Sequence, residues 1–371
     1  MTSPSNPLRK HAGKLLVSLL FAGGFLWLMK AGTLPFWPDQ SAFADVKAWT
    51  VIAYVVIWSL VHIVRAWRWK FLLDPIAHVP MRKMLLTSFI GFAAIVLLPM
   101  RAGELVRPAL VRDKGKLSGW SVTGTVAAER IIDGLVLSLM LLFGLIASTP
   151  LNPLPERIGT LPISPSVVPR AAYIALGVFA CAFVAMGLCY FARDWMRRVI
   201  RAIVGLASKG LADWISDRIE RVTLGLSFLP QLGKTIPFIL ATTGYWLMNA
   251  FAAVVLAHGT GLESVTFAQA CVLTGVLAIG IMVPNAPGFF GAFQFSAYAA
   301  LSLFVPEAQL FSHGSTLVFL LFVTQNGIMI AFALVAGALL HIGVGDALAA
   351  GDANMNDEGA LSAAAPETRQ T

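Results

Sequence analysis

Three arginines and one glutamate follow an apolar run near residue 100, and the arginines could bind an anion. The stretch LLPMRAGELVRPALVR covers residues 97–112 and contains Arg101, Glu104, Arg107 and Arg112. An arginine side chain donates two parallel, charge-assisted hydrogen bonds, which suits phosphate and carboxylate groups. These residues therefore predict a binding site for a phosphate-bearing ligand. The alternative is a short helix that ends at a membrane surface, where its arginines reach the lipid headgroups.

A second group of charges lies inside a long apolar stretch, in the sequence AAERIIDG at residues 127–134. Glu129 and Asp133 are four residues apart and share one face of a helix, with Arg130 about 100° away. Ionisable side chains inside a membrane are costly, and they usually pair with one another or line a pathway. We expect them to pair with the charges of residues 101–107, either in a binding site or in a purely structural network.

A third stretch contains no charged residue between Ser264 and Pro306. Its centre, VPNAPGFFGAFQ at 283–294, is rich in proline and glycine, which break helices. We predict a turn here that exposes the polar residue Asn285 near the middle of the membrane. The predicted turn residues of both stretches are Pro99, Gly103, Pro284, Pro287 and Gly288.

The composition places these residues in a membrane protein. Of the 371 residues, 57% are hydrophobic and 12% are charged, and the mean hydropathy is +0.77. A soluble domain carries about twice that share of charge. The net charge of +8 lies beside apolar segments, as in cytoplasmic membrane loops, so we expect no nucleic-acid partner. The three cysteines and six histidines show no metal-binding spacing, and we expect neither a metal nor a cofactor.

Eight apolar segments must position the charges, at about 15–30, 49–64, 84–98, 119–148, 171–192, 235–257, 267–304 and 314–343. The flanking loops 65–83 and 101–116 each contain five Lys or Arg, which places both in the cytoplasm. The run 84–98 between them spans only about 22 Å as a helix, short of a ~30 Å apolar layer. This pattern predicts a re-entrant hairpin that returns through 104–113.

The uncharged stretch predicts a second re-entrant hairpin, with two ordinary spans joined by a turn as the alternative. GFAAIVLLPMRAGEL (91–105) resembles GVLAIGIMVPNAPGFF (275–290), which suggests an internal repeat. The fold class predicted is an all-α polytopic membrane protein with about six full transmembrane helices, two re-entrant helical hairpins and two inverted-topology halves. One domain covers 1–343, with halves at about 10–148 and 168–343 joined by 149–167.

The motifs LLPMRAGELVRPALV, AAERIIDGL and VPNAPGFFGAFQ together resemble the transmembrane region of lysylphosphatidylglycerol synthases. This region also stands alone in a large flippase-like family of bacterial and archaeal membrane proteins. The resemblance covers about residues 10–343 and implies a lipid-handling module. It places Arg101, Glu104, Arg107, Glu129, Arg130 and Asp133 at the characteristic polar positions of the family. Gln294 departs from the pattern, because the family often has an acidic residue there.

We therefore expect a flippase or scramblase that moves an anionic or phosphate-bearing lipid between leaflets through a polar cavity between the two hairpins. The expected partner is a phospholipid or a polyprenyl-phosphate-type lipid. The predicted substrate-binding residues are Arg101, Glu104, Arg107, Arg112, Glu129, Arg130, Asp133 and Asn285. One alternative is a non-catalytic subunit that supports a lipid-modifying or glycosyl-transferring enzyme. Another is an enzyme with a carboxylate base, although no nucleophile, metal cluster or nucleotide motif favours it.

The remaining segments predict the location of the chain. Segment 193–234 contains eight Lys or Arg among tryptophan and aliphatic residues, which predicts an amphipathic cytoplasmic segment. It could bind a partner or serve as a solvated connector. Residues 344–371 predict a disordered cytoplasmic tail, and because this tail is short we expect no aminoacyl transfer. We expect a multi-pass protein of the bacterial inner membrane with both termini in the cytoplasm.

Overall fold

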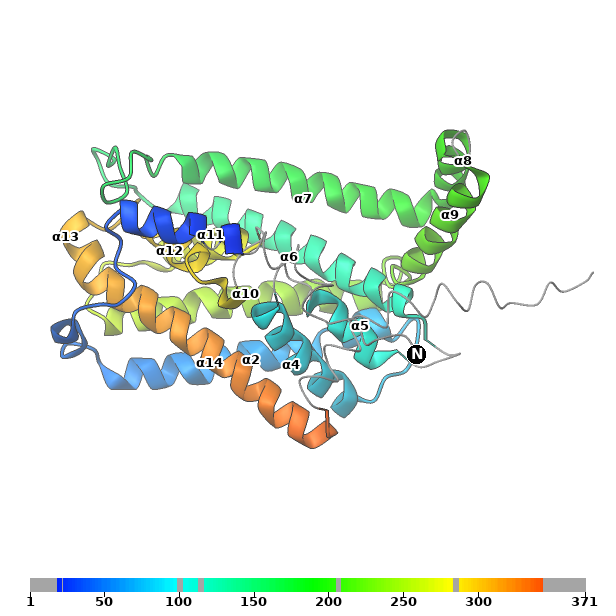
Figure 1. The fold of residues 1–371 in the computed structure, drawn as a ribbon, viewed down its shortest axis with the longest axis horizontal. Helices are drawn as coiled ribbons and strands as arrows, with labels where there is room; N and C mark the ends of the chain where they lie inside the picture. The colour runs from blue at the N-terminus through cyan, green and yellow to red at the C-terminus, as the bar shows by residue number, and fades with distance from the viewer. Residues whose placement is uncertain are drawn as a thin grey trace, which may run out of the picture.

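The computed structural model describes residues 19–21, 23–98, 103–112, 117–204, 208–282 and 287–342. Most of these residues form helices that run along the long axis of the molecule (Figure 1). A large buried apolar cluster lies between the helices, and a smaller cluster that includes Trp69, Phe228 and Phe238 lies towards one end. The described part of the chain is therefore a helical bundle, as the sequence predicts.

Five helical stretches are long and apolar enough to cross a membrane. They are Ala48–Leu73, which contains α2 (Ala48–Trp67) and α3 (Lys70–Leu73), then α6 (Gly119–Ala147), α7 (Val167–Phe191), α10 (Leu232–Gly259), and Glu307–Leu340, which contains α13 (Glu307–Gln309) and α14 (Ser315–Leu340). They match five of the six predicted spans. The first predicted span, at about 15–30, is described from residue 19 onward as a shorter apolar helix, Leu19–Ala31, apart from residue 22. The chain is thus a polytopic helical membrane protein.

The first predicted hairpin is formed by α4 (Met81–Leu97) and α5 (Val106–Val111). Near its open end, Lys83 Nζ donates to the Val111 carbonyl oxygen at 3.5 Å. Near its tip, a Cβ atom on Gly103 would overlap the backbone of Ala94, so only glycine permits this close approach. The pairs 83–111 and 94–103 define two antiparallel arms. Pro99 and Arg101 lie outside the described residues.

The second hairpin is formed by α11 (Phe267–Gly280) and α12 (Ala292–Leu301), which pack against each other. Thr266 starts α11 through a capping box with Gln269, which satisfies free amides of the first turn. In the short helical turn η3 (Pro287–Phe289), Gly288 has a φ of 76°, a conformation that favours glycine. Pro287 and Gly288 thus lie in a turn, whereas Pro284 and Asn285 lie outside the described residues.

The two hairpins pack in a reciprocal manner. The α4 helix of the first hairpin packs on α14, and the α11 helix of the second packs on α6, while α2 and α10 pack on each other. Each hairpin therefore contacts the last span of the other half. In Figure 1, α4 and α5 lie towards the end that carries α8 (Arg193–Val204) and α9 (Lys209–Leu224), and α11 and α12 lie towards the opposite end. This exchange is the pattern that two inverted halves produce.

One boundary prediction is wrong. Residues 65–83 were predicted to be a charged loop, but α2 continues to Trp67, α3 follows it, and α4 already begins at Met81. Arg68, at the junction of α2 and α3, is fully buried. The basic residues of this segment suggested a loop because a buried arginine looks the same in sequence as one facing water. The neighbours of Arg68 explain how its charge is tolerated.

Candidate functional site

Glu129 forms the centre of a buried ion network. It lies on α6 and is fully buried. Arg107 Nη1 of α5 donates to both carboxylate oxygens, at 3.0 and 3.2 Å, and Arg68 Nη2 donates to Oε1 at 3.1 Å. The neighbouring Arg130 Nη2 also donates to Oε1, at 2.5 Å. Three arginines from three parts of the chain thus share one carboxylate.

Asp133, one helical turn after Glu129, extends this network towards α10. Its carboxylate accepts a hydrogen bond from Arg68 Nη2 at 2.8 Å and one from the Tyr245 hydroxyl at 2.8 Å. Trp246 Nε1 donates to the same oxygen as Tyr245, at 3.4 Å. The spacing of Glu129 and Asp133 on one face lets a single arginine bridge them, as expected for an i, i+4 pair.

Two of the arginines are enclosed by aromatic rings. The Arg107 guanidinium lies 4.0 Å from the ring centre of Trp69. A Cβ atom on Gly91 would overlap the Arg107 side chain, so the glycine leaves room for this arginine. The Arg68 guanidinium lies between the rings of Phe238 and Tyr245, at 4.8 and 4.7 Å. Both side chains are fully buried. Cation–π contacts and ion pairs replace part of the lost water, although Arg68 Nε, Arg107 Nε and Arg107 Nη2 have no hydrogen-bond partner among the described residues. Because both arginines are held by buried carboxylates, we interpret them as structural.

A cavity of about 100 Å³, with charged and polar groups in a largely apolar lining, lies beside this network. Arg130 and Asp133 of the network line it, together with Arg65 of α2. Its polar and aromatic lining comes from both halves of the chain and comprises Trp58, Arg65, Arg130, Asp133, Trp246, Asn249, Thr274 and Gln325. Met282 and Phe293, from the region of the second hairpin, also line it. The cavity is thus positioned by spans of both halves and by one hairpin.

The cavity presents hydrogen-bond donors that the described residues leave unused. Among them, Trp58 Nε1 and Arg65 Nε are buried and have no hydrogen-bond partner. The Arg65 guanidinium lies 4.2 Å from the ring centre of Phe92, and within the described residues no ion pair joins it to a carboxylate. A buried donor without a partner is costly. The site is therefore suited to a ligand that accepts hydrogen bonds and carries negative charge.

The structure brings together five of the eight residues predicted from sequence. Glu104, Arg107, Glu129, Arg130 and Asp133 form one network, in which Glu104 Oε2 lies 3.8 Å from Arg130 Nε. Only Arg130 and Asp133 of this set line the cavity.

The other three predicted residues lie elsewhere. Arg112 follows α5 at the open end of the first hairpin, next to the Val111–Lys83 contact. Arg101 and Asn285 lie outside the described residues.

Sequence reasoning missed the contribution of α2, α10 and α14. Arg65 and Arg68 were counted among loop charges, although they lie three residues apart, one turn of a helix, in an apolar stretch. Asn249 and Gln325 are isolated amides within apolar spans, and such a residue is itself a signal for a polar interior site. In the part of the chain that the structure describes, no group of three or more His, Cys, Asp or Glu could hold a metal ion.

Comparisons with known proteins place the chain in context. The model of the family described as the lysylphosphatidylglycerol synthase TM region matches residues 15–322. The chain is 28% identical over 324 residues to "Glycosyltransferase AglD" of Haloferax volcanii, a match that covers 81% of the chain and 50% of that protein. The chain thus spans about half the length of this curated relative. No solved structure matches it.

Proposed function

The chain belongs to the family of the lysylphosphatidylglycerol synthase transmembrane region, and from that premise we propose that it moves a phosphate-bearing lipid between the leaflets of a membrane. In this proposal the chain acts as a flippase or scramblase and leaves the lipid chemically unchanged. The headgroup crosses through the cavity between the two halves, while the acyl chains stay in the apolar layer.

The observation that carries the proposal is the pair of arginines at the cavity. Arg65 and Arg130 both line it, and Arg65 has no carboxylate partner within the described residues. Charged groups inside a membrane protein usually pair or mark a substrate pathway. A phosphate group offers acceptors to both arginines and removes the cost of the unused donors. The Asp133 carboxylate accepts hydrogen bonds from Arg68 and Tyr245. Its Oδ2 atom lies 3.7 Å from Arg130 Nη1 and helps to hold the Arg130 side chain at the cavity.

The hairpins provide the second support. We propose that both are re-entrant: α4 and α5 enter from one side of the membrane, and α11 and α12 enter from the other. Broken helices at the meeting point of inverted repeats are a recurrent architecture of transporters. Irregular backbone at membrane depth is tolerated where it is covered by protein or lines a polar cavity. Met282, just after α11, lines the cavity.

The charge distribution supports an orientation for this transporter. The basic residues Lys70, Arg82 and Lys83 lie in α3 and at the start of α4, and α4 lies towards the end that carries α8 and α9 (Figure 1). The segments 32–47, 148–166, 260–266 and 302–306 at the opposite end contain Lys47 and Arg157 as their basic residues. We propose that the basic end faces the cytoplasm of a bacterial cell, with both termini on that side.

A second candidate function is a membrane subunit that supports a lipid-modifying or glycosyl-transferring enzyme. The observation that favours it is the coverage of the relative named as a glycosyltransferase, because half of that protein lies outside the match. A stoichiometric enzyme that co-purifies with the chain and is lost when α8 and α9 are deleted would support this candidate.

The test of the transport proposal is leaflet exchange in proteoliposomes. Phosphatidylglycerol and glucosylceramide, each labelled on an acyl chain, allow a phosphate headgroup to be compared with a phosphate-free polar headgroup. The proposal predicts that the protein accelerates exchange of phosphatidylglycerol well above the rate in protein-free vesicles and does so much less for glucosylceramide. Equal rates for the two lipids would show that the phosphate is not recognised, and no acceleration of any phosphate lipid would favour the subunit.

A further inference from the structure

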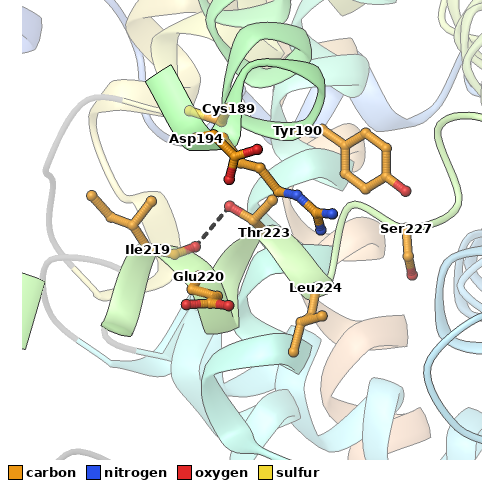
Figure 2. Close-up of a pocket in the computed structure, with 9 residues that line it drawn as sticks. Cys189, Tyr190, Asp194, Ile219, Glu220, Thr223, Leu224 and Ser227 are labelled. Carbon is orange, nitrogen blue, oxygen red and sulfur yellow. Dashed lines mark hydrogen bonds between the residues drawn. The ribbon is translucent and has the colours of Figure 1, made fainter. Parts of the chain in front are cut away.

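A second cavity lies at the end of α7, away from the ion network. It has a volume of about 290 Å³ and opens between the last turn of α7, the first turn of α8 and the end of α9. Its lining consists of Cys189, Tyr190, Arg193, Asp194, Ile219, Glu220, Thr223, Leu224 and Ser227. In Figure 2, Asp194 and Thr223 lie near the centre of the cavity, and Tyr190 and Ser227 lie to one side. We propose that this cavity binds the headgroup of an amine-bearing, zwitterionic phospholipid.

The position of the cavity favours a membrane lipid as the ligand. The apolar stretch of α7 that could cross a membrane ends at Phe191, and the cavity includes Cys189 and Tyr190 from its last turn. The cavity therefore lies where the chain leaves the apolar layer, at the depth of the headgroups. Tyrosine is enriched at this depth because its ring is apolar and its hydroxyl is polar.

The charges of the lining favour a headgroup that carries both signs. Arg193 supplies one cation for a phosphate group, and Asp194 supplies a carboxylate for an ammonium group. The Ser227 hydroxyl provides a further polar contact, while Thr223 Oγ1 donates to the Ile219 carbonyl oxygen at 2.7 Å. An anionic phosphoglycerol headgroup would leave the Asp194 carboxylate without a cation from the ligand. A phosphoethanolamine headgroup offers a phosphate to Arg193 and an ammonium group to Asp194.

The outer face of α7 offers a place for the acyl chains of the same lipid. Val184, Leu188 and Phe191 lie on one side of the helix, three to four residues apart, and are 60%, 49% and 71% exposed. These side chains lead along α7 up to the cavity. A lipid with its headgroup in the cavity could lay its chains along this surface, and it would join α7 to α8 and α9.

Alkylation of Cys189 measures occupancy directly, because this thiol lines the cavity. In a protein with Cys181→Ala and Cys271→Ala, Cys189 is the remaining cysteine of the sequence. The probes are phosphatidylethanolamine and phosphatidylglycerol with identical chains, and free phosphoethanolamine without chains, each added to the purified protein in detergent. We expect phosphatidylethanolamine to slow alkylation about tenfold, consistent with one or two charge-assisted hydrogen bonds. Phosphatidylglycerol and free phosphoethanolamine should slow it much less.

Matched variants separate binding from general effects on the fold. Arg193→Gln and Asp194→Asn should each restore fast alkylation in the presence of phosphatidylethanolamine. Arg82→Gln changes an exposed arginine of α4 outside the lining, and it should leave the protection intact. A single symmetric peak in size-exclusion chromatography checks that each variant is folded.

Three outcomes would overturn the proposal. They are no protection by phosphatidylethanolamine in the folded protein, equal protection by phosphatidylglycerol, and unchanged protection in both lining variants. If free phosphoethanolamine protects as well as the lipid, the ligand is a soluble phosphoamine and the assignment to a membrane lipid is wrong.

Discussion

The two helical hairpins occupy matching places in the fold but differ in their chemistry. The first brings Arg107 and Glu104 to the charges of α6, whereas α11 and α12 contain no charged residue. Yet α4 packs on α14 as α11 packs on α6, so the packing is shared between the halves. The two hairpins thus pack in a similar way, while the charged residues of the ion network come from the first half of the chain. The charged side of the cavity therefore comes from α2 and α6, and the second hairpin adds an uncharged side.

The difference between the hairpins is also a difference in what stabilises them. The first is tied to the bundle by buried ion pairs, each of which leaves a costly charge when one partner is removed. The second is tied by apolar packing and by caps at the helix ends, such as the Thr266 capping box. Substitutions at the two hairpins should therefore differ in size and in kind.

The largest effect is expected when the buried network is broken at the first hairpin. Arg107→Ala removes both hydrogen bonds to Glu129 from α5. Loss of one partner in a buried pair typically costs about 3–5 kcal/mol, so the variant should unfold at a clearly lower temperature or fail to fold. Arg82→Ala, at an exposed position on the first turn of α4, is the control and should change little. A melting temperature for Arg107→Ala close to that of the wild type would contradict the account.

A smaller effect is expected from closing the space between the hairpin arms. A Cβ at Gly103 meets the backbone of Ala94, which cannot move aside, whereas one at Gly280 meets the Ser296 side chain. Gly103→Ala should cost about 1–3 kcal/mol and Gly280→Ala less. Adding Ser296→Ala should recover part of the loss at position 280, and thermal unfolding checks both. If Gly280→Ala is the more damaging substitution, the two turns are not packed as described.

A milder effect is expected at Gln294, where the family often has an acidic residue. Its side-chain oxygen accepts a hydrogen bond from the Gly291 amide at 2.8 Å, at the start of α12. We interpret Gln294 as a cap of the second hairpin, since the lining of the cavity does not include it. Gln294→Ala should cost about 1 kcal/mol and leave the headgroup preference of leaflet exchange unchanged. A changed preference would show that Gln294 contacts the ligand.

The smallest effect is expected from an exposed ion pair at the open end of the second hairpin. Lys47 Nζ donates to Glu263 Oε1 at 2.8 Å, and this hydrogen bond lowers the pKa of Glu263. Because folding lowers the pKa of Glu263, the ion pair stabilises the folded protein at pH values above the ordinary pKa of a glutamate carboxyl group. This stabilisation is lost as the pH falls through the lowered pKa. Lys47→Met should therefore lower the melting temperature slightly at pH 7 and not at a pH below the lowered pKa. A larger decrease in the melting temperature of Lys47→Met at the acidic pH than at pH 7 would contradict this prediction.

Much of the fold could be predicted because membrane charge patterns are local. The short run 84–98 between two basic loops indicated a hairpin, and the structure shows its arms as α4 and α5. The shared face of Glu129 and Asp133 followed from helix geometry, and their contact with Arg107 followed from the cost of buried charge.

The missing part of the site depends on contacts between distant residues. Arg68 meets Glu129 61 positions away, and nothing in its own neighbourhood distinguishes it from a cytoplasmic arginine. The same holds for Arg65, which forms part of a cavity that helices of both halves close. Charge counting assigned both to a loop, because the rule that places arginines at the cytoplasmic surface does not consider their partners.

The central claim is that an arginine of the cavity, and not the buried network alone, recognises the lipid phosphate. It is tested most directly by leaflet exchange of phosphatidylglycerol in proteoliposomes that contain wild-type protein, Arg65→Gln or the control Arg198→Gln. Arg65→Gln removes a charge without breaking an ion pair among the described residues, so the protein should fold normally. The account predicts a rate at least about tenfold lower for Arg65→Gln, consistent with a lost charge-assisted hydrogen bond. A rate equal to that of the wild type in well-folded Arg65→Gln would contradict it.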